Sequence, residues 1–217
     1  GLGSSDLPTK RFVSILADKL YFHSPKIDNE LINRGKISGS ASRALKQLMY
    51  DLLRHEGQEN LCYNGNKYPA ERGLFASLLS STGLYGDQSG KFELNNPKTI
   101  STEFAKRISK MFEQTLNYLK ADPSRFVSFA EIYEKIWSQP PYGIKKGPRP
   151  LLAFLFIRSN LAKLAFYREE IFLTELEEID IDYIIRNPEL CALRFLEMDK
   201  TTKDILTGLA SISARFN

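Results

Sequence analysis

The stretch Leu151–Ile157 (LLAFLFI) constrains the fold most, because every one of its residues is apolar. A helix that is apolar on all sides has no face for water and must be surrounded by protein. The stretch is also much shorter than the about 20 apolar residues that a helix needs to span a bilayer. The sequence therefore predicts a buried helix over 151–161, with the rest of the chain packed around it.

Other segments show helical or strand-like spacing of apolar residues. Helices are expected over 8–22, from Ser38 or Ser40 to Gly57, and over 69–79, 101–120 and 129–137. Ser128 and Glu131 have the spacing of a capping box. Hairpins are expected over 84–94 and 163–176. A helix capped by Asp180 or Asp182 and a strand over 191–196 then complete the chain.

The order helix, turn, helix, hairpin is that of a winged helix, in which the hairpin covers apolar surface that two short helices leave open. The predicted fold class is mainly α with small β-hairpins, as two winged-helix-like units joined by a long helix. Residues 1–7 are interpreted as a cloning remnant or flexible lead. Residues 8–97 form the first unit, and residues 98–217 the connecting helix with the second unit.

Composition favours a folded chain, since apolar residues make up 42% and charged residues 26%. Cys62 and Cys191 lack metal-ligand spacing and are expected to be reduced thiols, which fits a cytoplasmic location. The sequence lacks the cationic start and following apolar stretch that are typical of a signal peptide, so none is predicted. No membrane contact is expected.

Motifs for catalysis are missing from the sequence. There is no GxxxxGK[ST] phosphate loop, and neither His23 nor His55 lies in a zinc pattern. Acidic pairs such as Glu169 with Glu170 belong to an acidic run that is typical of a solvated surface. No catalytic residue, metal ligand or cofactor is predicted, and the chain is not expected to be an enzyme. An unrecognised hydrolase or nuclease remains an alternative, because distant carboxylates can meet in space.

Charge distribution is more informative than the net charge of +4. From Lys135 to Arg168 there are seven basic residues and no acidic one, and Leu31–Tyr50 is also free of acids. Basic residues at the entry to a helix favour phosphate groups. The predicted nucleic-acid-binding residues are Lys145, Lys146, Arg149, Arg158, Arg34, Lys36, Arg43 and Lys46. The alternative interpretation is a pair of ordinary solvated loops.

A sequence-specific reader is not expected, because a recognition helix needs a polar face for base edges and 151–157 has none. Contacts to the DNA backbone position a protein without reading sequence. The sequence thus predicts a non-catalytic module that binds DNA non-specifically. A scaffold that contacts only other domains or subunits is the main alternative.

Several segments resemble one family. They are 139–154 (QPPYGIKKGPRPLLAF), 163–176 (KLAFYREEIFLTEL), 186–195 (RNPELCALRF), 29–53 (NELINRGKISGSASRALKQLMYDLL) and 66–86 (NKYPAERGLFASLLSSTGLYG). Together they are similar to the helical and winged-helix accessory region of large prokaryotic phage-defence P-loop ATPases, of the BREX type and related systems. The resemblance implies a fragment that accompanies an ATPase module. The ATPase motor motifs are absent from this sequence, so nucleotide hydrolysis is not carried over.

Overall fold

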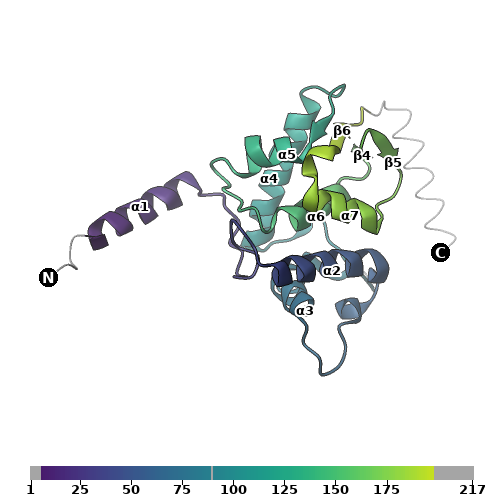
Figure 1. Ribbon diagram of the computed structural model, residues 1–217, viewed down its shortest axis with the longest axis horizontal. Coiled ribbons are helices and arrows are strands. Elements are labelled where there is room, and N and C mark those ends of the chain that lie inside the picture. Colours follow the sequence, from purple (N-terminus) through teal and green to yellow (C-terminus); the bar gives the residue numbers. More distant parts are fainter. Residues whose placement is uncertain (1–5, 89, 198–217) are drawn as a thin grey trace.

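A computed structural model of the chain describes residues 6–88 and 90–197, which form a mixed α/β fold (Figure 1). About half of this described part is helical, with seven α-helices and two small antiparallel sheets. The helices are α1 (Asp6–Leu20), α2 (Gly39–His55), α3 (Ala70–Phe75), α4 (Glu103–Lys120), α5 (Phe129–Ile132), α6 (Arg149–Ser159) and α7 (Glu178–Arg186). The strands are β1 (Tyr85–Gln88), β2 (Lys91–Leu94), β3 (Val127–Ser128), β4 (Leu164–Arg168), β5 (Ile171–Leu173) and β6 (Cys191–Phe195).

Helix α6 lies at the centre of the core, as the sequence predicts. All residues from Leu151 to Ile157 are buried, with exposed fractions of 4% or less. The ring of Phe156 packs edge-on against Phe112 of α4 and against Trp137. The Trp137 indole N–H donates to Thr115 Oγ1 at 2.9 Å, so this buried polar pair is satisfied. Burying so apolar a helix on all sides supplies much of the hydrophobic stabilisation.

The larger sheet has the strand order β3-β6-β4-β5, with all pairs antiparallel. Both predicted hairpins and the strand after residue 190 are confirmed. Glu169 and Glu170 form the β4–β5 turn at positive φ, as a two-residue hairpin of this kind requires. Strand β6 enters between β3 and β4, an arrangement that local sequence patterns do not specify.

Helix starts agree with the sequence in part. Ser38 caps α2 and Ser128 caps α5, each through a backbone N–H three residues on. The expected cap of the last helix is wrong. Glu177 caps α7, because Asp180 lies at the third helical position and its carboxylate accepts from the Glu177 N–H at 2.7 Å.

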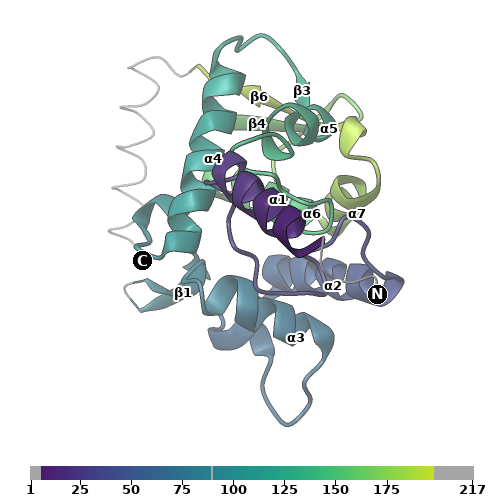
Figure 2. The ribbon, with the colours of Figure 1, turned by 90° about the vertical axis from the view of Figure 1, so that its left-hand side faces the viewer.

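One cluster of buried residues runs through both predicted units. It includes Leu48 of α2, Leu79, Ile108 of α4 and Phe154 of α6. Figure 2 shows α4 along one side of the body, between the β1–β2 hairpin and the larger sheet, and α4 contacts β6. The boundary at residue 97 stays a prediction. None of the described helices is long and apolar enough to cross a membrane.

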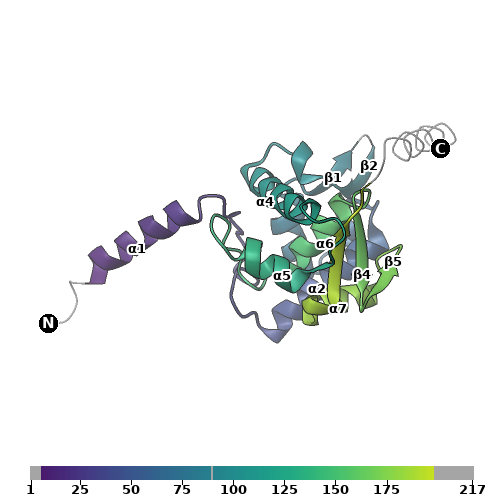
Figure 3. The same cartoon turned by 90° about the horizontal axis from the view of Figure 1, so that it is seen from above.

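Helix α1 extends away from the rest of the molecule (Figures 1 and 3). Its apolar side chains are exposed, including Phe12 at 63% and Leu20 at 53%. The segment after it is anchored, because the His23 N–H donates to Pro141 O at 3.1 Å. The Tyr21 ring lies over Gly143, where an added Cβ would be 2.5 Å from Tyr21 Cδ1. The projecting helix is thus attached through a specific contact at its carboxyl end.

Candidate nucleic-acid interface

The two acid-free segments of the sequence meet in space at the start of α6. The Lys145 Nζ donates to Asn33 O at 3.1 Å, and the Gly147 N–H donates to Arg34 O at 3.0 Å. A Cβ on Gly147 would lie only 2.0 Å from Ile32 O, so the residue must be glycine for the loops to approach this closely. Residues 31–37 and 143–148 therefore form one surface.

Five of the eight predicted residues are exposed, four on these two loops and Arg43 on α2. We call them the basic face: Arg34, Lys36, Arg43, Lys145 and Lys146. Among the described residues, their only ion pair within 4.0 Å joins Arg34 to Glu30, and both of those side chains are largely exposed. A pair of this kind is screened and weak. The cations of the basic face are therefore available to bind phosphate groups of a ligand.

The other three predicted residues are engaged within the protein. Arg149 donates through Nε and Nη2 to Ile144 O at 3.1 and 2.8 Å, and its guanidinium lies over the Tyr133 ring. Burial lowers the pKa of the Arg149 guanidinium. Arg158 pairs with Glu56, and Lys46 pairs with Asp182. These side chains join elements of the fold rather than offer charge to a ligand.

The amino end of α6 is covered, in contrast to the expectation of an anion site there. Gly147 and Pro148 are buried, and the carbonyl of Ile32 lies against Gly147. Pro148 precedes the helix without a capping side chain. Phosphate binding at this place depends on side chains from the two loops, not on free helix amides.

Acidic side chains also border the basic face. Asp28 and Glu30 line a hollow of about 690 Å³ together with Asn33, Arg34 and Lys145. Within residues 6–88 and 90–197, no three His, Cys, Asp or Glu side chains are grouped so that they could hold a metal ion. Burial raises the pKa of the Cys191 thiol to about 12. Cys191 is thus a protonated core residue rather than a nucleophile.

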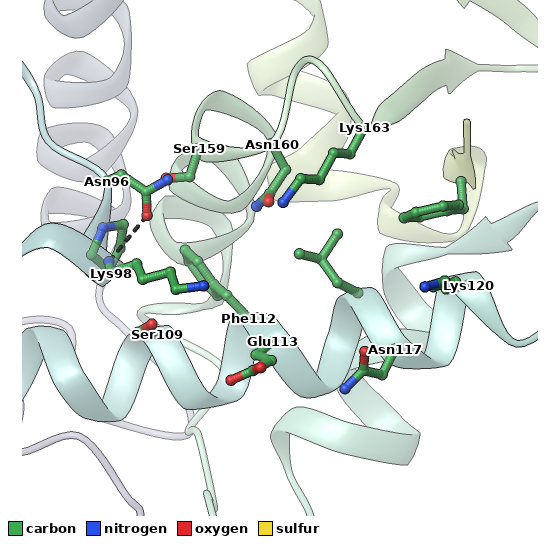
Figure 4. A pocket seen from close by; sticks show the side chains of 13 residues that line it. Asn96, Lys98, Ser109, Phe112, Glu113, Asn117, Lys120, Ser159, Asn160 and Lys163 are labelled. Carbon is green, nitrogen blue, oxygen red and sulfur yellow. Dashed lines mark hydrogen bonds between the residues drawn. The ribbon is translucent and has the colours of Figure 1, made fainter. Parts of the chain in front are cut away.

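A second hollow, of about 300 Å³, lies against α4 (Figure 4). Lys98 and Lys163 reach toward it from opposite sides, and Asn160 lies beside Lys163. Lys120 lines the same hollow, whose floor is formed by Phe112, Leu116 and Phe195. None of these three lysines was predicted to bind nucleic acid: Lys98 and Lys120 lie outside the two acid-free segments, and Lys163 lies within one but was not singled out. They come from separated segments, so no local pattern in the sequence groups them.

Comparisons with protein families, with curated proteins and with solved structures find no match.

Proposed function

We propose that the chain is a non-catalytic module that binds the DNA backbone non-specifically through the basic face. The observation that carries this proposal is the meeting of two acid-free segments, which brings four exposed cations onto neighbouring loops, with Arg43 on the helix that follows one of them. Lysine and arginine at such a surface release condensed counterions from phosphates and so provide affinity without sequence readout.

We also propose that α5, α6 and the β4–β5 hairpin act as a winged-helix-like unit, and that the chain is an accessory region of a phage-defence ATPase. The order of these elements supports the first point. The burial of residues 151–157 supports backbone contacts over base readout, because this part of α6 offers no polar face to the major groove.

The test is fluorescence anisotropy with a short labelled duplex of mixed sequence over about 50–200 mM salt. Affinity should fall steeply with salt, and the double variant Lys145→Ala/Lys146→Ala should reduce the log–log slope by about 2. The matched control is Lys67→Ala/Lys91→Ala, which removes two exposed lysines elsewhere and should leave the slope unchanged. Binding that is absent at low salt, or that ignores salt, contradicts the proposal.

A protein-docking scaffold is the second candidate, favoured by the exposed apolar side of α1. Phe12, Ile15, Leu16 and Leu20 follow helical spacing, and each is at least 42% exposed. Exposed apolar patches of this kind commonly mark contacts with other proteins.

Light scattering on the purified chain, and on the variant Phe12→Ser/Leu16→Ser, tests this candidate. Association that the variant abolishes supports docking through α1. A monomer in both cases, at all concentrations, leaves no self-docking role for this surface.

A further inference from the structure

Four adjoining hollows follow one another from the side of α4 to the basic face. Their volumes are about 300, 400, 730 and 690 Å³, in order from the hollow of Figure 4 to the basic face. Neighbouring hollows share lining residues. At the three junctions these are Lys98 with Pro97 and Ser109, Arg107 with Phe22, and Lys145 with Asn33 and Ile27. We call this feature the α4 groove; α4, with 18 residues, is about 27 Å long.

The α4 groove is lined by nine basic and five acidic side chains, a formal excess of four positive charges. Seven of the basic residues are exposed lysines with no ion pair within 4.0 Å in the described part of the chain: Lys26, Lys98, Lys106, Lys110, Lys120, Lys145 and Lys163. Burial, and then Lys110 and Arg107, lower the pKa of the His23 imidazole, as expected in a positive field. The lining of the three hollows nearest α4 is therefore positive and attracts anions, whereas two acidic and two basic side chains balance in the hollow beside the basic face.

Aromatic rings are placed along the same path. Phe22 is 56% exposed and lines two of the hollows, and Tyr21 beside it is 36% exposed. The rings of Phe22 and His23 lie 4.3 Å apart. At the far end, Phe195 and the buried Phe112 line the first hollow. Exposed rings between lysines provide stacking surfaces for unpaired bases.

We propose that the α4 groove binds single-stranded DNA, with lysines along the backbone and Phe22 stacked on a base. This inference rests on the proposed function and specifies the form of DNA that is bound. A flexible strand can follow a series of small hollows, and its bases are free to stack. A duplex is a stiff, wide cylinder that keeps its base faces covered, so the Phe22 ring gains nothing from it.

The experiment compares labelled oligothymidine with a matched duplex by fluorescence anisotropy, using the full chain and three variants. The groove variant is Lys106→Ala/Lys110→Ala, the stacking variant is Phe22→Ala, and the control is Lys67→Ala/Lys91→Ala. Thermal unfolding of each confirms folding, which exposed positions should not disturb. A strand carrying 2-aminopurine reports stacking directly through its fluorescence.

We expect the groove variant to reduce the single-strand salt slope by about 1.4, the value for two lost contacts. Phe22→Ala should weaken single-strand binding about fivefold or more, remove the 2-aminopurine signal and leave duplex affinity unchanged. The control should match the unmodified chain in every assay.

The outcomes separate this inference from the proposed function. If Lys145→Ala/Lys146→Ala weakens duplex binding while the groove and stacking variants change nothing, the groove inference is wrong and the proposed function stands. If the strand binds through the groove while no duplex binds, the groove stands and the interface on the basic face is wrong. Absence of binding to either DNA at low salt overturns both.

Discussion

At the scale of single residues, a positive charge in the sequence does not by itself show whether the side chain binds a ligand or stabilises the fold. Arg149 follows Lys145 and Lys146 closely in the sequence, yet its guanidinium is turned inward to the carbonyl of Ile144. Lys145 and Lys146 are exposed. Arg149 differs because, at the start of α6, its guanidinium contacts both the Ile144 carbonyl and the Tyr133 ring.

The substitution Arg149→Lys tests this structural role. Lysine keeps the charge but cannot donate twice to one carbonyl or stack its planar group on Tyr133. We expect the free energy of unfolding to fall by about 1–2 kcal/mol, measured by urea denaturation, with DNA affinity unchanged. Lys146→Ala, at an exposed position, should show the reverse pattern. Lost DNA binding without lost stability in Arg149→Lys would mean that this side chain meets a ligand.

Glu131 links stability to pH. Partial burial raises the pKa of Glu131, but hydrogen bonds from Tyr118, Lys135 and Arg125 outweigh burial, and the pKa is lowered from its ordinary 4.5. A carboxyl whose pKa is lower in the folded state stabilises the fold above about 4.5, and this contribution is lost as pH falls through the folded value.

Glu131→Gln should therefore be less stable than the unmodified chain by about 1 kcal/mol at neutral pH. The difference should shrink as the pH falls below 4.5 and through the lowered pKa of the folded Glu131, where the native carboxyl becomes protonated. Urea titrations of both proteins at several pH values measure the gap. If the difference in the free energy of unfolding between the two proteins stays constant down to acid pH, the ion pairs of Glu131 are not its cause.

At the scale of elements, the contact between residues 31–37 and 143–148 depends on Gly147. A Cβ there would meet Ile32 O at 2.0 Å and Ile37 Cγ2 at 2.7 Å. Gly147→Ala must push the loops apart, and we expect it to cost about 1–3 kcal/mol, as overpacking typically does. Because Lys145 and Arg34 lie beside this contact, affinity for DNA should fall as well.

Gly35→Ala is the matched control, since nothing lies within 4 Å of a Cβ at that position. It should leave both the melting temperature and the DNA affinity unchanged. Equal behaviour of the two variants would show that the basic face does not require this close approach.

The sequence predicted the elements better than their assembly. The buried helix, both hairpins and the caps by Ser38 and Ser128 follow from local patterns of apolar and capping residues, and all were confirmed. Register between distant strands is not a local property, so the place of β6 between β3 and β4 was not predicted. The α4 groove was missed for the same reason, because its lysines come from segments that are far apart in the sequence.

At the scale of the whole molecule, α1 differs from the other helices because its described side chains are exposed to solvent. An isolated helix of this length is marginal in water, and no described side chain of residues 11–20 is buried. The connection to the body is instead made by Tyr21 over Gly143 and by the His23 backbone. The body should therefore fold without α1.

Removal of residues 1–19 tests this independence. We expect a cooperative unfolding transition with a nearly unchanged melting temperature, because the removed helix contributes little buried apolar surface. The helical signal in far-UV circular dichroism should fall in proportion to the helical residues of α1 that are removed. Tyr21→Ala in the full chain is the comparison, and it should lower the melting temperature, because the ring that covers Gly143 is lost. If the shortened chain instead unfolds without cooperativity, α1 packs on the body in solution and its apolar side is not free for docking.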